Sequence, residues 1–375
     1  AAPLRAGIWR AVRLCQDALL GECDRTFRRY LDRFHEAGVE GLIDKRLSQV
    51  SQHRAPVDEV MVAVGLYRSR YQGWNVKHFY TWYCRDHAGL RSYTWVKNTL
   101  QAEGVVSCAP KRGTHRKRRE RSPLPGMMIH QDGSTHEWVS GQKWDLIVTM
   151  DDATNEQYSM FFVGEEGTLS SFRGVDEVIA GHGLFSSFYS DRGSHYWHTP
   201  TAGGKVDKVN PTQFGRALKQ LGIEMIAAYS PQARGRSERM FRTHQERLPK
   251  ELAAGIADMA AANRYLASVY RLAFNAEFMQ PAMEEGSAFV PWIGSGLDDI
   301  LCEQFERTVG NDNCVRFENL VLQIPPDRHR CHYVKAKVRV HRYPNVRLAI
   351  FHGPRKLATY DALGKEIKQK NKVVA

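Results

Sequence analysis

The order of strand and helix patterns between residues 127 and 252 constrains the fold more than any other feature of the sequence. Three strand patterns come first, each an apolar or β-branched run bounded by Gly, Asp or Asn: 127–134, 144–152 and 157–163. Helices and strands then alternate: a helix at 168–183, a strand at 184–191, a helix at 211–222, a strand at 223–230 and a helix at 235–252. This βββαβαβα order, with short connections, predicts a mixed α/β domain built around a five-stranded sheet.

Three acidic residues stand at the ends of these elements. Asp132 lies at the end of the first strand, Asp191 at the end of the fourth, and Glu238 opens the last helix. In an open sheet, residues just past the strand ends converge on the crevice where ligands bind. If the first and fourth strands are neighbours, Asp132 and Asp191 lie side by side, and the helix can bring Glu238 in beside them.

Three carboxylates in one small volume repel one another unless a cation neutralises them. Mg²⁺ suits one or two carboxylates together with substrate phosphate and retained waters. Two such ions about 3.5–4 Å apart can clamp the attacking and leaving oxygens of an in-line phosphoryl displacement. The predicted cofactor is therefore Mg²⁺, as two ions held by Asp132, Asp191 and Glu238, with Mn²⁺ as a substitute.

Each acid taken alone has a simpler interpretation. An Asp at a strand end is commonly a turn former, and a Glu in a first helical turn is favoured by the helix dipole. Asp151 and Asp152, in "TMDDATN", also end a strand and compete as ligands, although their context is rich in turn-forming residues. The element order favours the set Asp132, Asp191 and Glu238.

The charge balance of the 375-residue chain favours a polyanionic partner. Lys and Arg outnumber Asp and Glu by 53 to 41, which gives a formal net charge of +12. A surplus of this size favours nucleic acid first and an acidic membrane second. No apolar run approaches a membrane span, and no signal-peptide pattern opens the sequence. The seven cysteines form no CxxC pair, which is typical of reduced thiols in a cytosolic protein.

The regions on either side of residues 124–280 have their own patterns. Short helices are expected at 8–40, and three amphipathic helical segments within 57–104 resemble a helix-turn-helix DNA reader, a pattern that other small bundles share. In the third of these segments Ser92 is a plausible N-cap, and the candidate DNA contacts are Ser92, Tyr93, Thr94 and Lys97. Alternating strand patterns after residue 313 predict a small β-barrel, followed by a basic tail.

Residues 111–121, "KRGTHRKRRER", contain seven Lys or Arg and form a self-repelling linker or arm. Contact with DNA phosphates is expected from Lys111, Arg112, Arg116, Lys117, Arg118 and Arg119. Trp138, Trp144 and Trp197 could stack on a splayed base, although core packing is the simpler interpretation. The predicted domains are 1–50, 51–108, the linker 109–123, the catalytic core 124–280, the linker and barrel 281–362, and the tail 363–375.

Several motifs together resemble one family. "HQDGSTHEW", "VTMDDATN", "YSDRGSHYW", "TQFGRALKQLGIE" and "YSPQARGRSERMFRTHQERL" are similar to the catalytic core of DDE transposases, which has a retroviral-integrase-like, ribonuclease-H-type fold. The likeness is strongest to the ISNCY group of bacterial insertion-sequence transposases and extends over nearly the whole chain. One departure is a longer segment before Glu238, roughly 198–210, which is either a loop over the active site or a neutral surface insertion. The N-terminal helix-turn-helix also looks abbreviated.

The resemblance implies a function for each part of the chain. Asp132 and Asp191 match the metal-binding aspartates of the family and Glu238 its catalytic glutamate, with Arg234, Arg236 and Arg242 expected to hold phosphates. A DNA transposase would bind terminal inverted repeats, cleave element ends and join them to target DNA as a homodimer or larger assembly, in the cytoplasm of a bacterium and associated with the nucleoid. The alternatives are a non-catalytic DNA-binding repressor and a ribonuclease-H-type nuclease.

Overall fold

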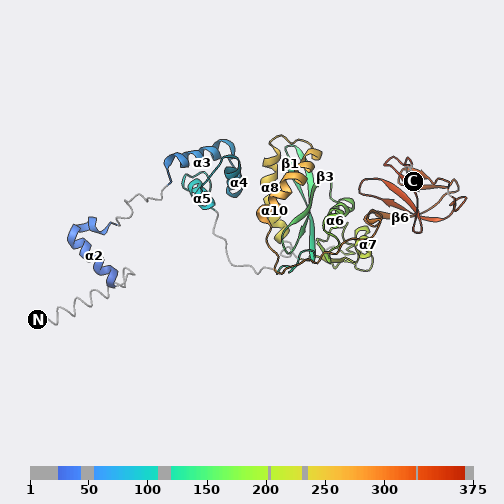
Figure 1. Ribbon diagram of the computed structural model, residues 1–375, viewed down its shortest axis with the longest axis horizontal. Helices are drawn as coiled ribbons and strands as arrows, with labels where there is room; N and C mark the ends of the chain where they lie inside the picture. The colour runs from blue at the N-terminus through green and yellow to red at the C-terminus, as the bar shows by residue number, and fades with distance from the viewer. Residues whose placement is uncertain are drawn as a thin grey trace, which may run out of the picture. The chain divides into compact units, whose positions relative to one another are not determined.

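The computed structural model describes residues 24–43, 55–108, 120–201, 204–229, 235–326 and 328–367. The chain divides into two compact units, 1–108 and 109–375. The second unit contains the predicted catalytic core and the C-terminal strands, and Figure 1 shows the elements of both units. The expected helical residues 8–23, most of the basic linker and the end of the basic tail lie outside the described residues.

The first unit is helical, as its periodicity predicts. Its helices are α2 (Asp24–Ala37), the short 3₁₀ helix η1 (Gly38–Leu42), α3 (Val57–Arg70), α4 (Val76–Asp86) and α5 (Tyr93–Ala102). Gly38 follows the end of α2 with φ +62°, a backbone conformation that glycine adopts at little cost. Asn75 and Ser92 cap α4 and α5 by accepting backbone N–H groups, so the predicted Ser92 cap is confirmed. Helices α3 to α5 enclose a core that includes Tyr67, Phe79 and Leu100.

The second unit is built around the predicted five-stranded sheet. Its strands are β1 (Met128–Val139), β2 (Gln142–Asp151), β3 (Gln157–Val163), β4 (Ser187–Ser190) and β5 (Glu224–Ala227), in the order β3-β2-β1-β4-β5. β1 pairs antiparallel with β2 and parallel with β4, and β4 pairs parallel with β5. The expected mixed α/β architecture is therefore confirmed, although β1 continues well beyond its predicted end because it forms a long hairpin with β2.

Helices cover both faces of this sheet (Figure 1). They are α6 (Thr168–His182), α7 (Gln213–Gln220), α8 (Gly235–Leu252), α9 (Met259–Tyr265) and α10 (Arg271–Phe278). One core cluster joins α6 and α7 to Ile129 and Phe188, and a second joins α8 to α10 to Leu146 and Val148. Because alternate residues of a strand point to opposite faces, β1 supplies odd-numbered residues to the α6 side and even-numbered residues to the α8 side.

Two predictions about the rest of the chain need correction. The helical pattern at 256–278 contains a π-helical turn, η4 (Leu266–Tyr270), between α9 and α10. After α11 (Leu297–Ile300), the strands are β6 (Glu303–Thr308), β7 (Cys314–Phe317), β8 (Leu320–Gln323), β9 (Lys337–Arg342), β10 (Leu348–His352) and β11 (Arg355–Tyr360). In the described part of the chain these strands form a four-stranded and a two-stranded sheet, β11-β10-β9-β6 and β7-β8, so the predicted small β-barrel is not confirmed.

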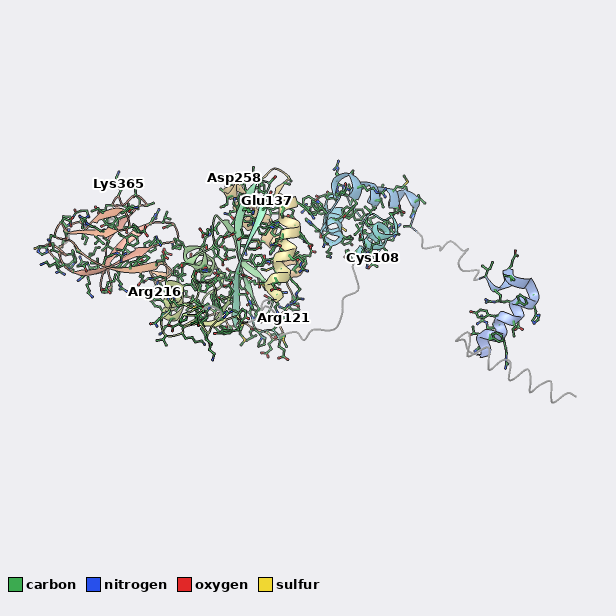
Figure 2. All side chains as sticks on the ribbon, turned by 180° about the vertical axis from the view of Figure 1, so that it is seen from behind. Cys108, Arg121, Glu137, Arg216, Asp258 and Lys365 are labelled. Carbon is green, nitrogen blue, oxygen red and sulfur yellow. The ribbon has the colours of Figure 1, made fainter. Side chains whose placement is uncertain are left out.

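One helix of the core anchors the C-terminal strands. Arg216 of α7, labelled in Figure 2, donates to the carbonyl oxygens of Ile300 and Cys302 at 3.2 and 2.5 Å. Gln213, one turn earlier, exchanges two hydrogen bonds with the main chain of Gln304. These contacts use four backbone groups near the start of β6, so they fix where the C-terminal sheet leaves the core.

Candidate active site

The sheet register brings Asp132 and Asp191 to one level. The parallel pairing of β1 with β4 sets His130 opposite Tyr189. Asp132 and Asp191 each follow two residues later, where β4 has ended and the edge of β1 is open. Both line one small pocket, of about 10 Å³, together with Ser190 and Ser237. The condition set by the sequence argument, that the first and fourth strands be neighbours, is met.

Backbone groups orient both carboxylates. Asp132 Oδ1 accepts a hydrogen bond from the Gly133 amide at 3.1 Å, and Asp191 Oδ1 accepts one from the Gly193 amide at 2.8 Å. Each bond fixes a side-chain rotamer without introducing a positive side chain. The two acids therefore present oxygen donors from neighbouring positions of the sheet edge, which is the ligand type that Mg²⁺ prefers.

Glu238 lies in the first turn of α8, immediately after Ser237, which lines the same pocket. Its side chain is exposed. Two turns further along the helix, Gln245 points from the same side of α8 and donates to Ser134 Oγ at 2.9 Å. Ser134 and Asp132 share a face of β1, so the side of α8 that carries Glu238 is the side that approaches the first acid.

The three acids do not form a closed cluster. Within the described residues, no group of three or more His, Cys, Asp or Glu side chains is close enough together to hold a metal ion. Asp132 and Asp191 come together in the pocket, whereas Glu238 stands beside it on an exposed helix turn. Two carboxylates are still a sufficient protein contribution for Mg²⁺ when substrate phosphate and water complete its coordination.

Asp151 and Asp152, the competing acids, are both fully buried and bonded to the protein. Asp151 Oδ2 accepts from the amides of Ala153 and Thr154 at 2.8 and 2.9 Å, which is the hydrogen bonding expected of a turn. Burial raises the pKa of Asp151, and these bonds oppose that effect. These hydrogen bonds favour a turn-forming role for Asp151 over a role as a metal ligand.

Asp152 connects three elements around the pocket. Its Oδ1 faces His130 Nε2 at 2.8 Å and pairs with Arg236 in the first turn of α8, while its Oδ2 accepts from the Ser122 amide at 2.8 Å. Burial alone would raise the pKa of Asp152, but the hydrogen bond and charge of His130, the Ser122 amide and Arg236 together lower it well below its usual range. The carboxylate therefore stays charged and ties β1 and α8 to the end of β2.

A second buried network holds the segment that follows Asp191. Tyr196 donates from its hydroxyl to Gln131 Oε1 at 2.9 Å and accepts from Ser171 Oγ at 3.3 Å. Gln131 in turn donates to Thr149 Oγ1 at 2.9 Å. Burial raises the pKa of Tyr196 far above its usual value, and the negative charges of Glu166, Asp132 and Asp191 add to the effect. The phenol therefore remains protonated in the field of these three carboxylates.

The residues expected to contact DNA are distributed unevenly. Lys111, Arg112, Arg116, Lys117, Arg118, Arg119 and Arg234 lie outside the described residues. Arg236 bonds to Asp152 and to the Glu120 carbonyl oxygen, which favours a positioning role over phosphate contact, whereas Arg242 is exposed on α8. On α5, Thr94 is exposed and Lys97 half-buried, Ser92 is the helix cap, and Tyr93 packs edge-to-face on Tyr80.

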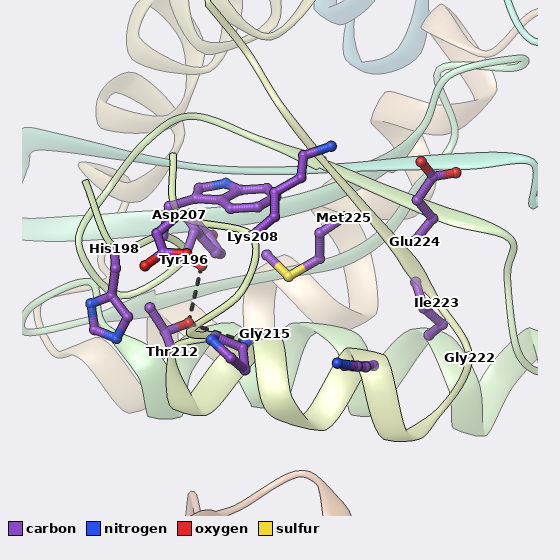
Figure 3. Close-up of a pocket in the computed structure, with 13 residues that line it drawn as sticks. Tyr196, His198, Asp207, Lys208, Thr212, Gly215, Gly222, Ile223, Glu224 and Met225 are labelled. Carbon is purple, nitrogen blue, oxygen red and sulfur yellow. Dashed lines mark hydrogen bonds between the residues drawn. The ribbon is translucent and has the colours of Figure 1, made fainter. Parts of the chain in front are cut away.

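A larger cavity of about 400 Å³ lies in the same domain (Figure 3). It is lined by α7, by the start of β5 and by the segment after Asp191 that the sequence marked as an insertion. Thr212, the cap of α7, closes one wall by donating to the Tyr196 carbonyl oxygen at 3.0 Å. Trp197 lines this cavity and donates to Ser190 Oγ at 3.1 Å, whereas Asp132 and Asp191 belong to the smaller pocket.

The three tryptophans considered for base stacking are core residues. Trp138, Trp144 and Trp197 expose at most 7% of their surface. Trp138 and Trp144 belong to the cluster under α8, and Trp197 to the cluster under α6 and α7. Core packing, the simpler interpretation of their sequence context, is the correct one.

Comparison with known proteins identifies the family. The chain is 30% identical over 343 residues to the transposase y4bF of Sinorhizobium fredii, a match that covers 88% of this chain and 73% of that protein. It is also 30% identical over 202 residues to the transposase for insertion sequence IS1202 of Streptococcus pneumoniae, covering 54% of this chain and 43% of that protein. No family model matches the chain.

Among solved structures, a simian T-cell lymphotropic virus intasome in complex with a PP2A regulatory subunit is 14% identical, with a TM-score of 0.34, and the match covers 82% of this chain and 96% of that chain. The HTLV-2 integrase catalytic core domain, solved with magnesium as a dimer, is 15% identical, with a TM-score of 0.30, and the match covers 39% of this chain and 90% of that chain. Both TM-scores lie below 0.5, so the family assignment rests on the sequence relatives.

The chain belongs to the transposase family of which y4bF is a member. It is a DNA transposase, as the sequence motifs predict, and the general activity of the family is the cutting and joining of DNA. In the described part of the chain, no helix is both long and apolar enough to cross a membrane.

Proposed function

We propose that this transposase cleaves the ends of its element and joins them to target DNA at the sheet edge formed by Asp132 and Asp191, with Glu238 completing the site. The observation that carries the proposal is the register of β1 and β4, because it sets two oriented carboxylates at one level beside an open strand edge. That edge leaves room for a DNA strand to approach, and Ser237 brings the start of α8 to the same pocket.

The acids fit a divalent metal, and Mg²⁺ is the proposed cofactor, with Mn²⁺ able to replace it. When bound, such ions would lower the pKa of a water nucleophile and offset charge on the phosphate. Asp132 and Asp191 would hold the metal through oxygens whose rotamers are already set by Gly133 and Gly193. Glu238, in the first turn of α8 beside the pocket, would supply a further carboxylate oxygen.

The chain's own residues would act mainly by positioning. The buried Asp152 would hold the start of α8 at a fixed distance from β1, so that Glu238 stays close to the other acids. Arg242, exposed on the same helix, would contact a DNA phosphate, as would Arg234 and the basic segment 111–121. A water would attack first, and the freed 3′ hydroxyl would then attack the target phosphodiester in the same site, with no covalent link to the protein.

The helical unit 55–108 is proposed to recognise the terminal inverted repeats of the element. A three-helix unit with a short turn before its last helix can place that helix in the major groove. The exposed Thr94 and the half-buried Lys97 lie in the first turns of α5, where a recognition helix contacts base edges. Because two element ends must be joined in concert, the active assembly is proposed to be at least a homodimer.

The test uses the full chain, Mg²⁺ or Mn²⁺, a labelled duplex with the element end, and a target plasmid. We expect joined products from the wild type and their loss in Asp132→Asn, Asp191→Asn and Glu238→Gln, with duplex binding preserved. Glu285→Gln, on an exposed loop, is the matched control and should join normally. Wild-type activity in Asp132→Asn would overturn the site, binding without any reaction in the wild type would favour a repressor, and cleavage of an RNA–DNA hybrid without joining would favour a nuclease.

A further inference from the structure

Two side chains that the sequence analysis did not select border the two acids. Glu166 lies in the connection between β3 and α6, and His195 follows Asp191 in the next turn of the chain. His195 Nε2 lies 3.5 Å from Glu166 Oε1. The two elements that they join are far apart in sequence, so this pair becomes visible only in the folded domain.

Glu166 lies directly against the strand that carries Asp132. A Cβ atom at Gly133 would lie only 2.2 Å from Glu166 Oε2, so the carboxylate occupies the space that a side chain would need there. Gly133 is the residue after Asp132, and its amide holds the Asp132 carboxylate. The absence of a side chain at Gly133 therefore allows the Glu166 carboxylate to lie against β1 on the α6 side, next to the residue that carries the first acid, while the Asp132 side chain is on the α8 side.

His195 lies in the same way against the residue that holds Asp191. A Cβ atom at Gly193 would be 3.0 Å from both Asp191 Oδ1 and His195 Cε1, and 3.3 Å from His195 Nδ1. The ring packs on Tyr196, with centroids 3.9 Å apart. The Nε2 side of the ring thus faces Glu166, and the Nδ1–Cε1 edge lies next to Gly193, where Asp191 also lies.

The pair is placed at the rim of the site and not in the core. The side chains of His195 and Glu166 expose 18% and 27% of their surface, so a DNA strand at the sheet edge can reach them. His195 Nε2, in contrast, is buried and makes no hydrogen bond within the described residues, and Glu166 Oε1 is its acidic neighbour at 3.5 Å. A carboxylate behind one ring nitrogen fixes the orientation of an imidazole and leaves the other nitrogen for a second partner.

We propose that His195 is a further catalytic residue that contacts the reacting DNA strand through Nδ1, and that Glu166 is its positioning residue. The inference rests on the proposed function, because it assigns the partner of Nδ1 as the phosphodiester or hydroxyl that reacts at Asp132 and Asp191. Glu166 holds the His195 ring on the α6 side of the sheet. Asp132 and Asp191 contact the same DNA strand from the open edge of the sheet.

Amide substitutions separate this role from a purely structural tie. The amide of Asn can replace the hydrogen bond at Nδ1, whereas that of Gln reaches the position of Nε2. In the joining assay we expect His195→Ala to lower kcat about 10–100-fold and to leave KM for the DNA end unchanged. Such a result means that the lost contact is made in the transition state and not in DNA binding. His195→Asn should retain more activity than His195→Gln.

Glu166 has its own variants. Glu166→Ala should lower kcat to the same degree as His195→Ala, whereas Glu166→Gln keeps an oxygen that faces Nε2 and should retain most activity. Gly133→Ala, which displaces the carboxylate without deleting it, should resemble Glu166→Ala. Exposed neighbours supply the matched controls, Glu165→Gln and His198→Asn, which should leave kcat unchanged.

Two results would overturn the inference. One is a wild-type kcat in His195→Ala while Asp132→Asn is inactive. That result would support the proposed active site and exclude a catalytic role for His195. The other is restoration by His195→Gln but not by His195→Asn, together with a lower unfolding temperature in His195→Ala, which identifies a structural tie to Glu166. Activity in Asp132→Asn, in contrast, would overturn the proposed function itself.

Discussion

Arg236, in the first turn of α8, pairs with the fully buried Asp152 at the end of β2. These residues are 84 positions apart in sequence, and Glu238 follows Arg236 by two. His130 contacts the same carboxylate from β1, at 2.8 Å. The helix that carries Glu238 is therefore fastened to both strands beside the acidic pocket through a single side chain.

Arg236→Gln is expected to destabilise the core domain and to slow joining. Removing one partner of a buried ion pair leaves an uncompensated charge and typically costs about 3–5 kcal/mol; His130 and the Ser122 amide still contact Asp152, so the lower end applies. Urea unfolding measures the loss, and the joining assay measures the displacement of Glu238. Arg239→Gln, exposed in the same turn, is the control and should leave stability within about 0.5 kcal/mol.

The salt dependence of binding distinguishes Arg236 from Arg242. A phosphate contact releases counterions, so its removal lowers the slope of log K against log salt by about one unit. We expect that decrease for Arg242→Gln, because Arg242 is exposed, and an unchanged slope for Arg236→Gln, because its guanidinium is bonded to Asp152 and Glu120. The opposite pattern would show that Arg236 contacts DNA and that its pairing with Asp152 is broken on binding.

Metal binding to the DNA-free protein should depend on two acids and not on three. Asp132 and Asp191 share the pocket, whereas Glu238 is exposed beside it. Titration with Mn²⁺, followed by calorimetry, should show affinity reduced about tenfold or more in Asp132→Asn and Asp191→Asn, since each removes one of two carboxylate ligands. Glu238→Gln should bind Mn²⁺ nearly as well as the wild type while losing joining activity. Equal losses in all three variants would mean that the free protein already holds the metal with Glu238.

Sequence patterns predicted the core domain because each of its elements carries its own periodicity. Residues 144–151 of β2 are buried on both faces, as a central strand must be. Asp191 stands just past the end of β4, as predicted, whereas Asp132 lies within β1 because that strand continues to Val139. The predicted site requires β1 and β4 to be neighbours, and the observed sheet order meets this requirement. Local periodicity therefore predicts the helices and strands, and their order along the chain limits the sheet topologies that they can form.

The remaining features depend on contacts between distant residues, which no local pattern encodes. Asp152 looks like a turn residue in "DDATN", yet its partners are His130 and Arg236. The π turn at 266–270 interrupts an unbroken helical pattern, and its residues Leu266 and Tyr270 are buried in the core. The C-terminal strands alternate as a barrel would, but alternation alone does not specify closure.

Two glycines of α6 should respond in opposite ways to alanine. In open helical positions Gly→Ala stabilises by up to about 1 kcal/mol. Gly181 has open space, whereas a Cβ atom at Gly174 would lie 2.2 Å from Gln131 Nε2 and 2.7 Å from Thr149 Oγ1. We expect Gly181→Ala to be neutral or stabilising and Gly174→Ala to cost about 1–3 kcal/mol by overpacking. Thermal unfolding of both variants tests whether α6 packs this closely on the Gln131 network, and an equal response would show that it does not.

The last prediction concerns the acid stability of the core domain. His244 of α8 is fully buried, with Nδ1 2.9 Å from the Tyr270 hydroxyl, and burial lowers its pKa to about 3, with the charge of Arg247 acting in the same direction. The folded protein therefore keeps this imidazole neutral at pH values where the unfolded chain, with a pKa of about 6.5, binds a proton. Its contribution is fully present above the unfolded pKa and is lost as pH falls below that value.

Between pH 6.5 and 4.5 the free energy of unfolding should fall by up to about 1.4 kcal/mol per pH unit from this one group. Asp152 does not interfere, because its lowered pKa confines its own loss of stability to pH values below its ordinary 3.8. His244→Asn, which keeps a polar group near Tyr270, should be less stable at pH 7.5 but show a flatter dependence across this window. His198→Asn, at an exposed position, should keep the wild-type slope. If His244→Asn keeps it as well, the buried imidazole is not the group that the fold holds neutral.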